Sequence, residues 1–167
     1  METNNKPEQS PPINTFVTIV IVMGIILACI LLFLSLPNYW SMFGYAEWEF
    51  QPFFSREGIK DLYHSLHNYL LLEMLVAIVA TVCIIFFLVK LLQGKRYGFW
   101  GFAVTSIVAT AVQVILGRLI VNAFREIEVE LPHNIPIQVG WTLTTIAILY
   151  AVLQTRKEGV SCWKQLE

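Results

Sequence analysis

The chain has 167 residues, of which 56% are hydrophobic and only 14% are charged, and its mean hydropathy is +0.63. A soluble domain carries about 25% charged residues, so this composition excludes an ordinary soluble domain and indicates a membrane protein. The formal net charge of −1 provides no basic surface, so we expect no nucleic-acid binding.

Four long apolar stretches cover residues 13–36, 69–92, 98–122 and 135–154. At about 1.5 Å per residue, each can cross a hydrocarbon core of about 30 Å. The sequence therefore predicts an all-α integral membrane four-helix bundle, in which the lipid bilayer surrounds residues 15–154.

Polar tails flank this membrane domain at both ends of the chain. Residues 1–14 contain three prolines and are expected to be disordered, and residues 155–167 are expected to form the second tail.

Residues 37–68 are expected to form the one sizeable loop outside the membrane, and this loop is rich in aromatic residues. Ile59, Leu62, Tyr63 and Leu66 follow the spacing of an amphipathic helix, which we expect to lie on the membrane surface before the second span. The loop is interpreted first as an aromatic anchor in the headgroup layer. The alternatives are a lid over a polar cavity and a docking surface for a partner.

Positive charges separate into two groups along the chain. With four spans, one side of the membrane carries Lys6, Lys90, Lys95, Arg96, Arg156, Lys157 and Lys164, whereas the other side carries only Arg56, Lys60 and Arg125. Because positive residues concentrate in cytoplasmic loops, we expect both termini to be cytoplasmic.

Glu73 and Arg118 are the ionisable residues that lie well inside the predicted spans. Glu73 lies 22 residues before Lys95, where the second and third spans are expected to turn, and Arg118 lies 23 residues after it. The two side chains are therefore expected at similar depths, and we predict an ion pair between them. The pair is interpreted as a structural feature that fixes the register of the two helices; the alternative is a polar site that opens outward.

Four polar residues are expected near the same depth or at the rim of the membrane. They are Asn68, Gln113, Asn122 and Gln138. Any polar site in this protein is therefore expected to open to the outside.

A row of residues at intervals of four runs along the third span, and all but Gln113 are small: Gly101, Thr105, Ala109, Gln113 and Gly117. Such a ridge allows close approach between membrane helices. We interpret the third span as the central packing helix, and the alternative is an interface between copies of the chain.

Three histidines are the candidate metal ligands, namely His64, His67 and His133. The H-x-x-H spacing alone does not define a zinc site, and surface histidines are the simpler interpretation. The sequence has no recognised catalytic motif, so we expect no enzymatic activity and no cofactor.

Two short segments carry a resemblance to known proteins: Leu-Gln-Gly-Lys-Arg-Tyr-Gly-Phe-Trp at 92–100 and Lys-Glu-Gly-Val-Ser-Cys-Trp at 157–163. They resemble a loose group of small four-span bacterial inner-membrane proteins. The resemblance implies a multi-pass protein of the bacterial inner membrane and implies no particular activity. The chain does not resemble the claudins, because the first loop lacks paired cysteines.

Three functions are compatible with these sequence features. The first is a non-catalytic membrane protein that binds another membrane protein, or a second copy of itself, through its aromatic loop and its third span, as assembly subunits and immunity proteins do. The second is a small oligomeric transporter or channel with a site around Glu73 and Arg118. The third is a metal-dependent membrane enzyme.

Overall fold

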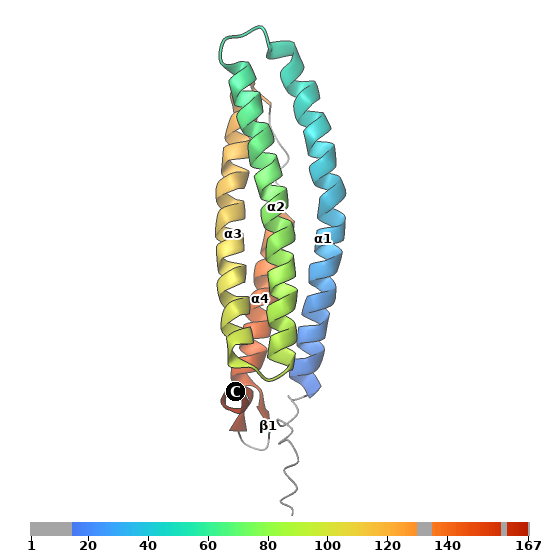
Figure 1. The fold of residues 1–167 in the computed structure, drawn as a ribbon, viewed down its shortest axis with the longest axis vertical. Coiled ribbons are helices and arrows are strands. Elements are labelled where there is room, and N and C mark those ends of the chain that lie inside the picture. Colours follow the sequence, from blue (N-terminus) through green and yellow to red (C-terminus); the bar gives the residue numbers. More distant parts are fainter. Residues whose placement is uncertain (1–14, 130–134, 158–159, 167) are drawn as a thin grey trace, which may run out of the picture.

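The protein consists almost entirely of helices in a computed structural model that describes residues 15–129, 135–157 and 160–166. Four long helices, α1 (Thr15–Phe50), α2 (Ile59–Leu92), α3 (Arg96–Arg125) and α4 (Ile135–Gln154), lie side by side (Figure 1). The chain direction alternates from each helix to the next. The predictions for residues 1–14 and for His133 lie outside the described residues.

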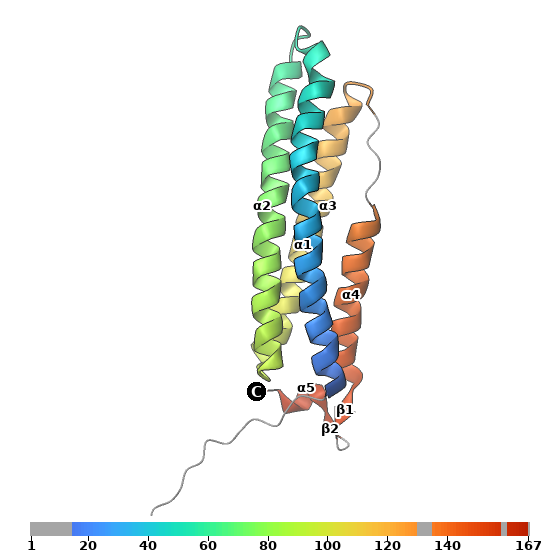
Figure 2. The same cartoon turned by 90° about the vertical axis from the view of Figure 1, so that its right-hand side faces the viewer.

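The molecule has two ends, which we name by what lies there. The hairpin end carries the connection between α1 and α2, which includes the short 3-10 helix η1 (Gln51–Phe53). The tail end carries the α2–α3 turn, the two short strands β1 (Arg156–Lys157) and β2 (Val160–Ser161), and α5 (Cys162–Gln165) (Figure 2). The strands pair with each other in antiparallel fashion.

Three helices are long and apolar enough to cross a membrane, and the part of α4 whose side chains are described, Trp141–Gln154, is a shorter apolar helix. Large apolar side chains are exposed on all four helices. Apart from Trp40 and Trp48 of α1, they lie within residues 16–36 of α1, 71–89 of α2, 97–119 of α3 and 143–153 of α4. We call this surface the apolar belt. On α2 it is about 28 Å long at 1.5 Å per residue, which matches a hydrocarbon core of about 30 Å.

Buried residues on α3 recur at alternating intervals of three and four. This seam comprises Phe99, Phe102, Ser106, Ala109, the half-buried Gln113, Leu116, Ile120 and Ala123. The spacing keeps one face of the helix against its neighbours, as in coiled coils. Helix α3 packs mainly against α2, and α2 in turn packs against α1 as well. The prediction that the third span is the central packing helix is therefore not confirmed.

The predicted loop at 37–68 is wrong, because α1 and α2 are helical through most of it. Helix α1 continues from Leu36 through Pro37 to Phe50, and α2 already begins at Ile59. Only residues 51–58 connect the two helices. Proline signals a helix end because it removes one backbone hydrogen bond. Here the packing of the following segment outweighs that local cost.

The predicted surface helix is helical, but it does not lie flat on a membrane. Residues 59–66 form the first turns of α2 and run straight into the rest of that helix. Leu66 is fully buried and Leu62 is half-buried, so the apolar face of this segment packs against the protein. The pattern gave the correct helix and the correct face, but its partner is protein rather than lipid.

The turn between α2 and α3 depends on two glycines. Gly94 has a φ of +78°, a conformation that favours glycine. At Gly98 an added Cβ would lie 2.5 Å from the backbone nitrogen of Leu91 and 2.8 Å from the carbonyl oxygen of Phe87. The start of α3 therefore lies directly on the backbone of α2.

Candidate functional site

The hairpin end extends well beyond the apolar belt. Helices α1, α2 and α3 have 36, 34 and 30 residues, whereas α4 has only 20. Figure 2 shows that α4 begins well short of the hairpin end. The remaining part consists of residues 41–58 of α1 and the first connection, residues 59–70 of α2, and residues 120–129 of α3 and its continuation. We call this part the head.

The head has its own apolar core, which explains why α1 does not stop at Pro37. Its buried members are Ala46, Phe50, Leu66, Leu70, Ile120, Ala123, Phe124 and Ile127. Each of the three helices contributes to this cluster. Burial of a large apolar side chain contributes about 1.5–3 kcal/mol, so several such residues exceed the cost of one backbone hydrogen bond lost at Pro37.

Aromatic rings join the three helices of the head. The ring of Phe50 lies 5.5 Å from Phe124 in an edge-on arrangement and 5.8 Å from Tyr63. Tyr45 stacks on Phe124 with ring centroids 5.8 Å apart. Such pairs stabilise a fold by about 0.5–1.5 kcal/mol beyond the burial of apolar area. These ring contacts therefore help to hold α1, α2 and α3 together in the head.

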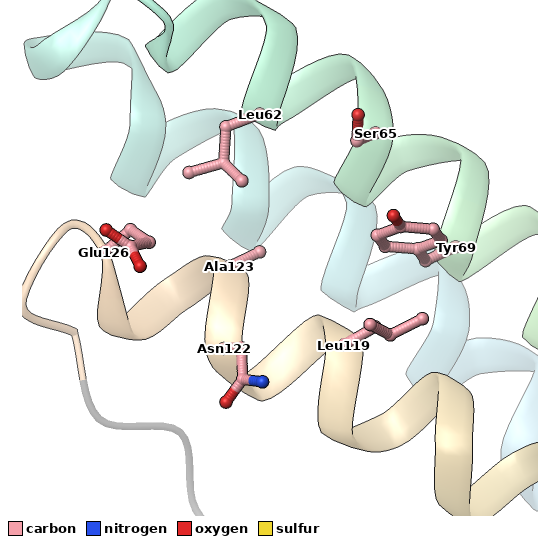
Figure 3. Close-up of a pocket in the computed structure, with 7 residues that line it drawn as sticks. All are labelled: Leu62, Ser65, Tyr69, Leu119, Asn122, Ala123 and Glu126. Atoms are coloured by element: carbon pink, nitrogen blue, oxygen red, sulfur yellow. The ribbon is translucent and has the colours of Figure 1, made fainter.

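A pocket of about 250 Å³ lies between α2 and α3 where the head meets the belt (Figure 3). Its polar lining comes from Ser65 and Tyr69 on α2 and from Asn122 and Glu126 in α3 and its cap. Of these, the sequence predicted Asn122 alone. These groups can hydrogen-bond a polar molecule at the membrane surface, but together they make no recognised catalytic arrangement.

Glu73 lies in the core-facing row of α2, between the buried residues Leu70 and Ala77. Its carboxyl group is half-buried and close enough to Tyr39 of α1 for its charge to act on the phenol. Ala77 and Ile84, which follow on the same face of α2, are buried. Glu73 therefore faces α1.

Arg118 lies on a different side of α3 from the one that the predicted ion pair requires. Its side chain is exposed, whereas Leu116 and Ile120, two residues before and after it, are buried. Two residues correspond to about 200° around a helix, so Arg118 points away from the core. Within the described ranges, no ion pair joins Arg118 to Glu73. The two side chains do lie at similar heights, near the edge of the belt.

Those of the other predicted polar residues whose side chains the structure describes do not converge on one site. Gln113 is half-buried in the seam of α3, whereas Asn68 and Asn122 are exposed. Gln138 lies in α4, and its side chain is outside the described residues. The interior of the head beside them is apolar and aromatic.

The small-residue ridge of α3 is largely used within the chain. A Cβ added to Gly101 would collide with the ring of Phe87, and Ala109 is buried. Thr105 is half-buried, and Gly117 has no heavy atom within 4 Å of an added Cβ. Gly101 and Ala109 are therefore unavailable to a second copy of the chain.

The two described histidines do not belong to a group of metal-ligating side chains among the described residues. His64 and His67 are exposed on α2, and the ring of His67 lies 4.8 Å from Phe43. Among the residues whose placement is described, no three His, Cys, Asp or Glu side chains come together as a metal site would require.

The C-terminal segment closes the tail end, which the sequence did not predict. The indole of Trp163 lies 4.8 Å from Phe99 and 6.0 Å from Trp100, and the guanidinium of Arg96 lies 5.6 Å above it. Leu166 is 5% exposed and joins the adjacent core. The two segments that carry the resemblance to four-span proteins thus contact each other, which their aromatic residues could have suggested.

Comparison with known proteins identifies no relative. No protein family, curated protein or solved structure matches the chain. The function is therefore inferred from the belt, the head and their charges.

Proposed function

We propose that this chain is a four-span membrane protein that uses its head to dock another membrane protein and carries out no chemistry itself. The observation that carries the proposal is the head: three helices leave the apolar belt and continue together for about 18 Å, at 1.5 Å per residue over residues 59–70 of α2. Lipid does not require such an extension, because a helix of about 20 residues already spans the bilayer.

The distribution of charge supports an orientation with the head outside the cytoplasm. The described cations of the tail end include Lys90, Lys95, Arg96 and Lys164, and the head carries Arg56, Lys60 and Arg125. In the sequence the tail-end group also includes the lysine and arginine residues at 6, 156 and 157. The positive-inside rule then places the tail end in the cytoplasm, as in a bacterial inner-membrane protein.

The same head disfavours the alternative of an oligomeric transporter or channel. Phe50, Leu66 and Phe124 are fully buried between the three helices. A substrate path along this axis would need polar groups or water, because charged and polar solutes are costly to place among apolar side chains. The metal-dependent enzyme has no supporting observation in the described part of the chain.

Site-specific photocrosslinking in native membranes tests the proposal. A photoreactive residue at the exposed head positions Glu47, His64 and Asn122 is expected to give an adduct with one other membrane protein. The same residue at the belt positions Phe33 and Val82 serves as the matched control. The crosslinked protein, once identified, must then bind the purified chain in lipid nanodiscs.

Two outcomes would contradict the proposal. One is the absence of a protein adduct at every head position together with an adduct at belt positions. The other is a stable homo-oligomer, measured by light scattering and mass spectrometry of the solubilised protein, that contains no second polypeptide.

A further inference from the structure

Two exposed tryptophans lie on α1, Trp40 just before the head begins and Trp48 within it. Trp40 is 80% exposed and Trp48 is 69% exposed. The large apolar side chains exposed on α2 begin only at Leu71, and those on α3 end at Leu119. Within the described head, Trp48 of α1 is therefore the one exposed large apolar side chain.

The two indoles lie on one side of α1, with a glycine between them. Trp40, Gly44 and Trp48 are spaced by four residues, which places them on one helix face. A Cβ added to Gly44 would have no heavy atom within 4 Å. The result is an open notch between two tryptophans about 12 Å apart along the helix. We call these three residues the tryptophan face.

The depth of Trp48 is not that of a lipid anchor. Trp40 lies four residues beyond Leu36, the last belt residue of α1. Trp40 is therefore at the edge of the belt, where tryptophan commonly anchors in the headgroups. Trp48 lies about 12 Å further out, whereas the headgroup layer is only about 5–8 Å thick on each side.

Carboxylates flank Trp48 on both sides. Glu47 is exposed, and its charge acts on Tyr63 of α2. Glu49 lies beside the hydroxyl of Tyr45, which stacks on Phe124 of α3. Helix α1 has no lysine or arginine along its whole length.

The head as a whole is acidic. Its described residues carry six carboxylates and three cations: Glu47, Glu49, Glu57, Asp61, Glu126 and Glu128 against Arg56, Lys60 and Arg125. Of the cations, Arg56 lies 4.8 Å above the ring of Phe53. A partner with positive charge is therefore favoured by electrostatic complementarity.

We propose that the tryptophan face binds a helix of the partner membrane protein that bears arginine or lysine side chains. A cation of that helix stacks on Trp48 and pairs with Glu47, while Gly44 lets the helix backbone approach closely. A second copy of the chain is a poor occupant, because two acidic heads repel each other. This inference rests on the proposed function and names the chemistry of its partner.

The test uses the full chain in nanodiscs of zwitterionic lipid and two synthetic 20-residue helical peptides. The peptides share one alanine and leucine face and carry arginine in one case and glutamate in the other. The arginine peptide is expected to bind the protein more tightly than it binds empty nanodiscs, and the glutamate peptide is not. Trp48→Ala is expected to weaken binding at least tenfold, and Glu47→Gln several-fold with a smaller salt dependence.

Phe33→Ala is the matched control, because Phe33 is a 76% exposed aromatic of the same helix within the belt. It is expected to leave peptide binding unchanged. Equal binding of the two peptides, or equal binding by Trp48→Ala and the unaltered chain, would overturn the inference.

Two further outcomes would replace the proposed occupant. If the fluorescence of Trp48, in a chain whose other four tryptophans are phenylalanine, is quenched by headgroup-labelled lipid, Trp48 is a lipid anchor. If the chain forms a homodimer that Trp48→Ala dissociates, a second copy of the chain occupies the tryptophan face. A partner protein that crosslinks only at His64 or Asn122 would overturn the tryptophan face while leaving the proposed function intact; a lack of adducts at all head positions would remove both.

Discussion

Glu73 is a half-buried acid on the core-facing side of α2, and the structure places Tyr39 beside it rather than Arg118. The distinction changes the expected effect of neutralising it. A buried pair loses about 3–5 kcal/mol when one partner is removed, because the other charge remains buried and unpaired. An exposed Arg118 has no such penalty.

We therefore expect Glu73→Gln to leave the free energy of unfolding unchanged or slightly increased. In a double-mutant cycle with Arg118→Gln, the coupling between the two sites should stay below about 0.5 kcal/mol. The measurement is unfolding in mixed detergent micelles followed by circular dichroism. A coupling of several kcal/mol would restore the ion pair that the sequence predicted.

Gly98 provides a second test at the residue scale, because the backbone of α2 occupies the space that a side chain at this position would need. A Cβ there would lie 2.5 Å from a backbone nitrogen, which cannot move aside as a flexible side chain can. Overpacking of this kind costs about 1–3 kcal/mol or more. We expect Gly98→Ala to lower the free energy of unfolding by at least that amount.

Gly117→Ala is the matched control on the same helix, since nothing lies within 4 Å of its added Cβ. It is expected to be neutral, or to stabilise the helix by up to about 1 kcal/mol through the higher helix propensity of alanine. Similar losses for both variants would show that the close α2–α3 contact at Gly98 is not what holds the turn.

At the scale of elements, the long apolar helices could be predicted from the sequence, and their connections could be predicted only in part. The tight turn near Lys95 and the amphipathic pattern at 59–66 are local signals, and both are found. The extension of α1 to Phe50 is not a local signal. It depends on contact with Phe124, which lies 74 residues further along the chain.

The same limit applies to the candidate site. The heights of Glu73 and Arg118 follow from counting residues from the turn, and that count is sound. The direction in which each side chain points depends on which face of its helix is buried. A shift of two residues along the helix moves a side chain to the opposite side. The buried residues Phe102, Ala109 and Leu116 show which face of α3 is turned to the core. Arg118 lies outside that face.

Phe50 is the residue on which the extension of α1 depends most directly, because it is fully buried between Tyr63 and Phe124. Phe50→Ala should remove about 3–5 kcal/mol of local packing energy. We expect the head to open, and the connection at 51–58 to become sensitive to protease at concentrations that leave the unaltered chain intact. Trp48→Ala, two residues away and largely exposed, should leave protease resistance unchanged; equal sensitivity of the two variants would contradict a packed head.

At the scale of the whole molecule, the belt and the charges together determine how the protein sits in a membrane. The belt alone does not determine the orientation of the protein, because its thickness fits a bilayer whichever end faces the cytoplasm. The asymmetry comes from the cations at the tail end and the acids of the head. Neither packing nor helix length supplies this information, so orientation requires its own measurement.

That measurement is cysteine labelling of intact cells. Ser55 is exposed in the α1–α2 connection, and Lys164 is exposed in α5 at the opposite end. In a chain with Cys29, Cys83 and Cys162 replaced by alanine, we expect Ser55→Cys to react with a membrane-impermeant maleimide from outside. Lys164→Cys should react only after lysis. The reverse pattern would place the acidic head in the cytoplasm. It would then be the cytoplasmic side that must supply the arginine- or lysine-bearing partner, since the tryptophan face would be accessible only from there.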